Sequence, residues 1–321
     1  MTSHLKNLVT SRYMHTALRL IVLSVFAVIL YRIIDVKLLI QALQHVRLIS
    51  IIAAILLYFI SISIRAYRWE LILNKDGKRL LLQDAYVISL IGVALNMFVP
   101  ATLGDIAKSY YGYKIYGIKE EMLSTSLVDK MFAFCALFLM GAFSGVIMKQ
   151  YLLSLFSFCT ALLTAIFLFS PRWFPWNVLN TLLRVFKKSL DVEKLHIAFT
   201  LSSHLKIIIL AISFGGWLFT SFYFYILCTA FSLRIDFIYL LLMRPVLEVA
   251  RLFPFTINSL GPREVVVAYF FKNIGLSPTL AVLVSLFSNI ISSVIPGSIG
   301  LAIILIRGHR TKMNAIRTKE C

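Results

Sequence analysis

Four groups of ionisable residues lie within or beside long apolar runs, where a charged side chain needs a partner or a function. Asp105 and Lys108 form the first group and are three residues apart, so they share one face of a helix. Asp129 and Lys130 form the second, near the start of an apolar run. Neighbours on a helix point about 100° apart, so these two cannot simply pair with each other. Each is expected to find a partner elsewhere or to extend toward the membrane surface.

The residues of the third group lie along one face of a predicted helix. Arg244, Glu248 and Arg251 are spaced by four and three residues within a strongly apolar segment. Together they keep one positive charge, which suits the binding of a phosphate group. The alternative is a structural network that fixes this segment to a neighbouring helix. Pro245 follows Arg244 directly and predicts that the helix begins or bends there.

The fourth group, Arg263 and Glu264, follows Gly261 and Pro262. Proline suits the first turn of a helix, so Arg263 and Glu264 are expected to open a new helix. An acid in that turn complements the helix dipole, which gives Glu264 a simple capping role. Either residue could instead belong to a switch coupled to protons or lipid.

The first group also has two interpretations. Asp105 and Lys108 form a neutralised ion pair at the tip of a hairpin, or Lys108 and free amides at a helix start receive an anionic headgroup. Asn96, one turn before Pro100, either satisfies carbonyl groups freed by a break in the helix or contacts substrate. The candidates for headgroup binding are Asn96, Lys108, Lys130, Arg244, Arg251 and Arg263. The candidates for charge balance or proton coupling are Asp105, Asp129, Glu248 and Glu264.

The segments that hold these residues form an internal pseudo-repeat, about 85–147 and 237–306. In each, a Pro and a Gly interrupt an apolar run, an acid follows the Gly, and another Gly comes eleven or twelve residues later. Breaks at membrane depth are tolerated where they face protein or a water-filled cavity, and duplicated interrupted segments are typical of transporters. The breaks are predicted at Pro100, Gly104, Pro254, Gly261 and Pro262.

The composition is that of an integral membrane protein. Of 321 residues, 60% are hydrophobic and 14% charged, whereas about a quarter would be charged in a soluble domain. Crossing the hydrocarbon core takes a helix of about 20 apolar residues. Six runs qualify: Leu18–Ile34, Leu48–Ile64, Leu127–Ile147, Leu152–Phe169, Ile207–Phe231 and Leu280–Ile306. No cleavage site follows the first run, which is expected to remain as a membrane anchor.

Two further apolar runs are interrupted: Ala85–Val99 with Ile106–Tyr116, and Phe237–Phe255 with Val265–Phe271. If each pair is a re-entrant hairpin, most Lys and Arg residues fall on the cytoplasmic side, as the positive-inside rule requires. The hairpins then enter from opposite faces, an inverted arrangement that suits alternating access. We therefore predict an all-α polytopic membrane protein with one integral domain over 1–321. It has about six full transmembrane helices, two inverted re-entrant hairpins and short cytoplasmic termini.

The basic residues flank apolar spans rather than forming one stripe, so the net charge of +18 indicates membrane topology and not nucleic-acid binding. Arg65 and Arg68 count among these cytoplasmic charges. The four cysteines and six histidines show no pairing or ligand spacing, so no disulfide framework, metal or cofactor is expected. No nucleophile elbow, phosphate-binding loop or dinucleotide fingerprint occurs, so we predict no catalytic residues and no enzymatic activity.

Three motifs follow one another in a fixed order. They are Asn96-x3-Pro100-x3-Gly104-Asp105-x2-Lys108, then Ser126-Leu127-Val128-Asp129-Lys130, then Leu260-Gly261-Pro262-Arg263-Glu264. In this order and spacing, over roughly Leu20 to Ile306, the chain resembles the lysylphosphatidylglycerol synthase transmembrane region family, also called flippase-like membrane proteins. That family usually has Glu for Asp105, Arg for Lys108 and Lys130, and a Gly-Gly-x-Gly-Val-Arg-Glu run where this chain has a proline.

The resemblance implies a membrane domain that moves or handles lipids between leaflets. Lysylphosphatidylglycerol synthases add a soluble aminoacyl-transferring domain, whereas this sequence ends at Cys321, so that activity is not expected. We predict a multi-pass protein of the cell inner (plasma) membrane that translocates or handles an anionic phospholipid or a polyprenyl-phosphate-linked lipid. One alternative is a non-transporting scaffold that partners a glycosyltransferase or another enzyme of envelope-lipid synthesis. A second is an intramembrane enzyme acting on a lipid-linked substrate.

Overall fold

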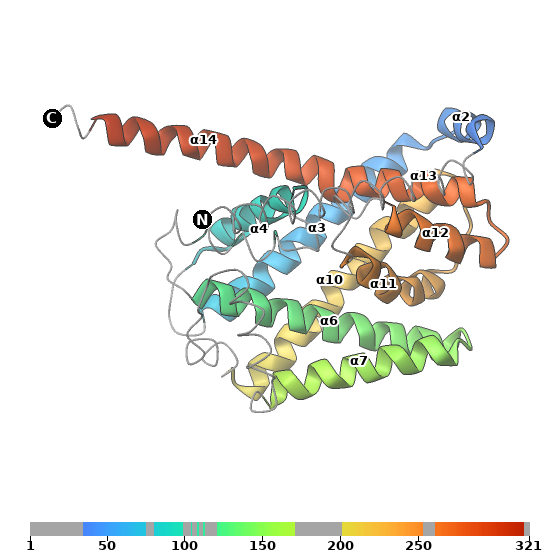
Figure 1. Ribbon diagram of the computed structural model, residues 1–321, viewed down its shortest axis with the longest axis horizontal. Helices are drawn as coiled ribbons and strands as arrows, with labels where there is room; N and C mark the ends of the chain where they lie inside the picture. Colours follow the sequence, from blue (N-terminus) through green and yellow to red (C-terminus); the bar gives the residue numbers. More distant parts are fainter. Residues whose placement is uncertain are drawn as a thin grey trace, which may run out of the picture.

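All described elements of the protein are helices (Figure 1). The computed structural model describes residues 35–74, 80–98, 104, 108, 112, 121–170, 201–252 and 261–317, and no strand occurs in these ranges. The predicted anchor Leu18–Ile34 and the site candidates Pro100, Asp105 and Pro254 lie outside them.

Five helical segments are long and apolar enough to cross a membrane. They are Leu48–Leu73 (α3), Ser124–Ile147 (within α6, Glu121–Ile147), Tyr151–Phe169 (α7), Ser203–Ala230 (α10) and Pro278–Ile306. The last combines α13 (Pro278–Asn289), a π-helical turn (Ile290–Val294) and the start of α14 (Ile295–Arg317). These five correspond to the five predicted spans in the described part of the chain. The all-α polytopic membrane fold is therefore confirmed.

Four helices are shorter than a span. They are α2 (Val36–Gln44), α4 (Leu82–Asn96), α11 (Phe237–Arg251) and α12 (Pro262–Asn273). Helix α4 ends at Asn96, and positions 104, 108 and 112 are helical, so the break predicted at Gly104 falls on a helical residue. Helix α11 ends at Arg251, and α12 begins at Pro262, directly after Gly261, as these two residues predicted. Re-entrance and inverted orientation of the two pairs stay predictions.

Helix α11 does not begin at Pro245, which was one of the two expectations for this residue. It begins at Phe237, where the Asp236 carboxylate accepts a hydrogen bond from the Ile238 amide at 2.9 Å, and Pro245 lies in its interior. The proline ring lies against Gly141 of α6, where an added Cβ would meet it. The absence of a side chain at Gly141 therefore lets α11 approach α6 closely.

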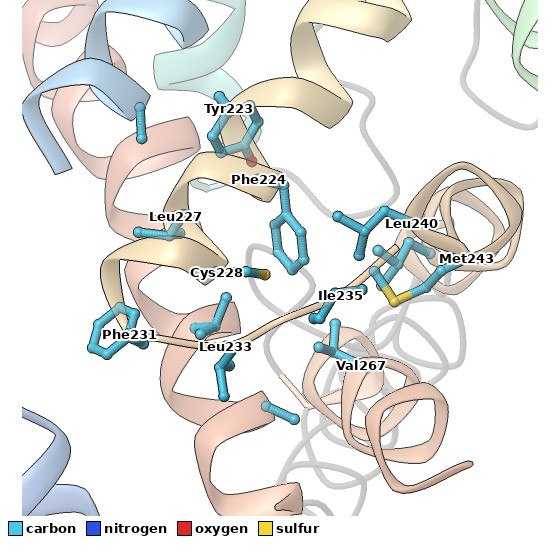
Figure 2. Close-up of a cluster of buried hydrophobic side chains, with 14 of the residues drawn as sticks. Tyr223, Phe224, Leu227, Cys228, Phe231, Leu233, Ile235, Leu240, Met243 and Val267 are labelled. Atoms are coloured by element: carbon cyan, nitrogen blue, oxygen red, sulfur yellow. The ribbon is translucent and has the colours of Figure 1, made fainter. Parts of the chain in front are cut away.

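The helices pack mainly in pairs. Helix α3 packs along α10, α6 along α7, and α4 along α14, while α12 lies between α11 and α13 (Figure 1). Buried apolar side chains of α10, α11 and α12, among them Phe224, Met243 and Val267, form the largest core cluster (Figure 2). This packing buries Arg244 and Glu248 of α11 and Arg263 and Glu264 of α12, which belong to two of the predicted charged groups.

Helices α4 and α14 approach closely because small residues line the contact. A Cβ added at Gly300 would collide with the Leu90 carbonyl group, and one at Gly297 with the Met97 side chain. We expect Gly300→Ala to lower the free energy of unfolding by about 1–3 kcal/mol, since backbone must shift to admit the methyl group. Thermal melting of the purified protein in detergent measures this change.

Gly215 of α10 provides the matched control, since an added Cβ there meets nothing within 4 Å. Alanine favours a helix over glycine by about 1 kcal/mol, so Gly215→Ala is expected to match or exceed the wild-type stability. Equal melting temperatures for the two variants would contradict the close approach of α4 and α14.

Candidate functional site

A buried ion pair joins α3 to α6. The Arg68 Nε donates to Asp129 Oδ1 at 2.6 Å, and Arg68 Nη1 donates to the Ser213 hydroxyl of α10 at 3.1 Å. Both charged residues are buried. Asp129 therefore finds its partner on a full-length span and not in an interrupted segment. Helix α3 continues beyond Ile64 to Leu73 and carries Arg68 into the bundle, while the side of the membrane on which Arg68 lies stays a prediction.

Three charged residues of α11 lie on one face, as their spacing predicts. The Arg251 Nη1 donates to both carboxylate oxygens of Glu248, at 3.1 and 3.2 Å. The charges of Arg244 and, from α6, of Lys130 also act on this carboxylate. Lys130 therefore lies near enough to α11 for its charge to act on Glu248, while its neighbour Asp129 pairs with Arg68 of α3.

Arg244 is 4% exposed and its hydrogen-bond partner is neutral. Its Nη2 donates to the Thr220 carbonyl oxygen at 2.5 Å, and its Cζ lies 5.2 Å and 5.6 Å from the ring centroids of Phe224 and Tyr223. Within the described part of the chain, Arg244 Nε has no hydrogen-bond partner. One donor of a buried guanidinium thus remains unused.

Arg263 is 5% exposed and lies at the start of α12. Its position depends on Gly261, whose φ of +100° side chains rarely adopt, and on Pro262 in the first turn. The Arg263 Nη2 donates to the Ser288 hydroxyl, which in turn shares a hydrogen bond of 2.7 Å with the Tyr223 hydroxyl. Because the Tyr223 ring also faces Arg244, these contacts bring the two guanidinium groups to one region, where their charges interact.

Glu264 is fully buried and both of its carboxylate oxygens are used. Oε2 accepts from the Gly261 amide at 2.6 Å, and Oε1 accepts from the Ser285 hydroxyl of α13 at 3.0 Å. This geometry supports the capping interpretation: Glu264 closes the first turn of α12 and fixes that turn to α13.

The first interrupted segment contributes a contact of a different kind. Lys108 is buried, and its Nζ lies 4.3 Å from the ring centroid of Trp69 on α3, a cation–π contact. Gly104 lies against the Asn96 backbone and side chain, so an added Cβ would collide with them. Asn96, the last residue of α4, thus packs against Gly104, and its two proposed roles stay open.

Polar groups that the sequence interpretation did not assign extend this site to α3. The Tyr58 hydroxyl donates to the Ser292 carbonyl oxygen at 2.8 Å and accepts from Arg65 Nη2 at 3.2 Å. The Tyr58 ring packs edge-on against Tyr223, with centroids 5.0 Å apart. Pro296 has no amide hydrogen, so it cannot donate to the Ser292 carbonyl as a residue four positions along a helix normally does.

The structure therefore brings five predicted residues together on α6, α11 and α12. We call Lys130, Arg244, Glu248, Arg251 and Arg263 the basic cluster. Four basic side chains and one carboxylate gather inside an apolar bundle, an arrangement that attracts an anion and not a cation. Nowhere in the described ranges do three His, Cys, Asp or Glu side chains come close enough to hold a metal ion.

Spacing within apolar helices could have identified the missed residues. Thr220 and Tyr223 are three apart on α10, and Ser285 and Ser288 are three apart on α13. Such pairs share a helix face, but polar residues of this kind are common in packed membrane helices. The spacing alone therefore does not distinguish a site from ordinary helix contacts.

Comparison with known proteins identifies the family of this chain. No match was found among curated proteins. The family model described as Lysylphosphatidylglycerol synthase TM region matches residues 17–300, which include both interrupted segments and every candidate site residue. That match links this membrane protein to lipid handling. The chain belongs to the lysylphosphatidylglycerol synthase TM region family.

Proposed function

We propose that this protein translocates or handles an anionic lipid between the leaflets of a cell membrane, with the basic cluster receiving the headgroup phosphate. The observation that carries the proposal is the state of Arg244 and Arg263. Both guanidinium groups are buried, and their hydrogen-bond partners, Thr220 and Ser288, are neutral. The membership of a family linked to lipid handling supports the same conclusion.

The cost of burying these charges supports a functional role for them. An arginine at membrane depth is expensive unless an anion or a polar cavity compensates it. Guanidinium groups match phosphate oxygens in geometry and bind them through paired hydrogen bonds. A headgroup phosphate between Arg244 and Arg263 would supply the compensating charge that their neutral partners lack.

The predicted route of the lipid headgroup between the leaflets runs along the interrupted helices. Helices α11 and α12 hold most of the basic cluster, and α4 with the helical residue Lys108 forms the corresponding segment of the other half. We predict that both pairs are re-entrant and inverted, so that the site opens to each leaflet in turn. The protein would then be a transporter of the inner (plasma) membrane with cytoplasmic termini and no catalytic role.

Leaflet exchange in proteoliposomes tests this proposal, with labelled phosphatidylglycerol and a labelled polyprenyl-phosphate lipid as probes. We expect the wild-type protein to accelerate exchange of at least one probe and Arg263→Gln to slow it at least about tenfold, since a charged hydrogen bond to phosphate is lost. Lys272→Gln removes an exposed charge from the same helix, α12, and is expected to exchange lipid like the wild type.

The outcomes separate the competing functions. Exchange of neither probe by a folded wild-type protein would contradict the proposal. A tight complex with a glycosyltransferase, together with tolerance of Arg263→Gln, would favour the scaffold alternative. A chemically altered probe after incubation would favour an intramembrane enzyme.

A further inference from the structure

We infer that the π-helical turn Ile290–Val294 is a hinge within the last predicted span, that Tyr58 holds it in the observed conformation, and that the basic cluster is coupled to it. The coupling rests on the proposed function, because it requires an anion at Arg263. The hinge itself does not depend on what the protein binds.

The backbone of this turn departs from α-helical hydrogen bonding. The Ile295 amide donates to the Ile290 carbonyl oxygen, five residues back. Pro296 follows and has no amide hydrogen for the Ser292 carbonyl oxygen, four residues back. Because π-turns and prolines are the usual places where a long helix bends, this turn is where the span Pro278–Ile306 is expected to bend.

The helices on the two sides of the turn are fixed to different neighbours (Figure 1). Helix α13 packs on α12, where the Ser288 hydroxyl accepts from Arg263. Helix α14 packs on α4 so closely that a Cβ added at Gly300 would collide with the Leu90 carbonyl group. A bend at the turn would therefore move α14 together with α4 relative to α12 and α13, with α4 sliding along α3, which it also contacts.

Tyr58 of α3 supplies the donor that Pro296 cannot. The Tyr58 hydroxyl donates to the Ser292 carbonyl oxygen at 2.8 Å and accepts from Arg65 Nη2 at 3.2 Å. Accepting from a guanidinium polarises the hydroxyl and strengthens it as a donor. Tyr58 is buried, so removal of its hydroxyl takes this donor from the central residue of the turn.

A series of side-chain contacts joins the hinge to the basic cluster. The Tyr58 ring packs edge-on against the Tyr223 ring, with centroids 5.0 Å apart. The Tyr223 hydroxyl shares a hydrogen bond of 2.7 Å with Ser288, which accepts from Arg263, and it also interacts with the Ser292 side chain. An anion at Arg263 would compete with Ser288 for the guanidinium donor and change the contacts of Tyr223 beside the hinge. The anion would then bind the two conformations with different affinity, which is the condition for shifting between them.

Distances between spin labels test the hinge in the full-length protein in phosphatidylcholine nanodiscs. One labelled pair, Lys272→Cys with Leu305→Cys, joins α12 to α14 across the turn. The control pair, Leu82→Cys with Leu305→Cys, joins α4 to α14. All three positions are exposed, and the exposed Cys159 and the terminal Cys321 are first replaced by serine.

We expect Tyr58→Phe to shift or broaden the α12–α14 distance by about 5 Å and to leave the α4–α14 distance unchanged. This value corresponds to a bend of about 20°, since the stretch from Ile295 to Leu305 extends about 15 Å. Tyr239→Phe is the matched control, because the Tyr239 hydroxyl donates to the Phe270 carbonyl oxygen, also at 2.8 Å, away from the turn. That variant is expected to leave both distances unchanged.

Pro296→Ala provides a second test that removes no side-chain hydrogen bond. Alanine restores an amide that can donate to the Ser292 carbonyl oxygen, so this variant is expected to show one narrow distance in each pair. The double variant Tyr58→Phe/Pro296→Ala is expected to regain the wild-type α12–α14 distance. A Tyr58→Phe variant that merely weakens packing would not be rescued in this way.

Anionic lipids test the coupling. Part of the phosphatidylcholine is replaced by phosphatidylglycerol with the same acyl chains or, separately, by a polyprenyl-phosphate lipid. We expect at least one of them to shift the α12–α14 distance of the wild type and not the α4–α14 distance. Arg263→Gln, which removes the charge, and Pro296→Ala, which stiffens the turn, are both expected to abolish this shift.

Each result has a defined meaning. Unchanged distances in Tyr58→Phe, or equal changes in both labelled pairs or in Tyr239→Phe, would overturn the hinge. If Tyr58→Phe does not fold, a lipid-dependent shift that Pro296→Ala retains would overturn it instead. A wild-type distance that neither lipid changes, or a shift that persists in Arg263→Gln, would overturn the coupling.

The same variants separate this inference from the proposed function. A lipid-dependent hinge movement without leaflet exchange would support the hinge and contradict translocation. Wild-type rates of leaflet exchange in Pro296→Ala, with its α12–α14 distance fixed, would support translocation and contradict a role of the hinge in it.

Discussion

Replacing Asp129 with alanine is expected to destabilise the folded protein by about 3–5 kcal/mol, because it leaves a buried guanidinium without its carboxylate. The Arg68 Nε donates to Asp129 at 2.6 Å, and both side chains are less than one-tenth exposed. The remaining hydrogen bond from Arg68 to Ser213 is made to a neutral hydroxyl and cannot compensate the charge. Thermal unfolding in detergent, checked by the yield of monodisperse protein, measures the loss.

The double variant Arg68→Met/Asp129→Ala is the control for this prediction. Methionine approximates the length of arginine without its charge, and removing both members of a buried pair costs far less than removing one. We expect the double variant to be more stable than Asp129→Ala alone. If the single variant were as stable as the wild type, the ion pair would not contribute to the fold.

Replacing Glu264 with alanine is expected to lower the free energy of unfolding by about 2–4 kcal/mol, because a helix cap and a charged hydrogen bond between helices are lost. The Gly261 amide and the Ser285 hydroxyl would both lose their acceptor in a fully buried position. Glu264→Gln keeps one acceptor oxygen and should lose about half as much. Thermal unfolding in detergent again provides the measurement.

Asp84 offers a matched comparison for Glu264, because it holds the same third position in the first turn of α4. Leu81, the residue that precedes α4, makes no side-chain cap. Asp84→Ala should therefore lower the free energy of unfolding by no more than about 0.5–1 kcal/mol, through the helix dipole alone. Equal losses of unfolding free energy in Asp84→Ala and Glu264→Ala would mean that the contacts of Glu264 add nothing to stability.

Because Glu264→Ala is expected to destabilise the fold, a transport defect in this variant has to be corrected for the fraction of folded protein before it is assigned to the site.

Much of the fold could be predicted from local sequence features. Runs of about 20 apolar residues marked the spans, because hydrocarbon thickness fixes the length that a helix needs. Gly261 and Pro262 marked the start of α12, because proline fixes φ in a first helical turn and glycine permits the φ of +100° at position 261. The end of α3 was placed too early, since Arg65 and Arg68 were interpreted as a boundary.

Part of the site could also be predicted from the spacing of residues along a helix. Positions 244, 248 and 251 share a face of α11 because helical periodicity alone places them there. Glu264 was expected to cap a helix because Pro262 fixes where that helix starts. These statements depend only on residues within one or two turns of each other, which a single sequence contains.

Only the tertiary structure decided which distant groups meet. The pairing of Arg68 with Asp129 spans 61 positions of sequence, and the contact of Arg263 with Ser288 requires α12 to pack on α13. Tyr223 joins the site because α10 packs against α11 and α13, although nothing in its apolar surroundings distinguishes it in the sequence. The sequence by itself determined the class of protein, the spans and the charged faces. Packing between helices decided which charges are neutralised and left Arg244 and Arg263 with neutral partners, because such contacts depend on approach in space and not on spacing along the chain.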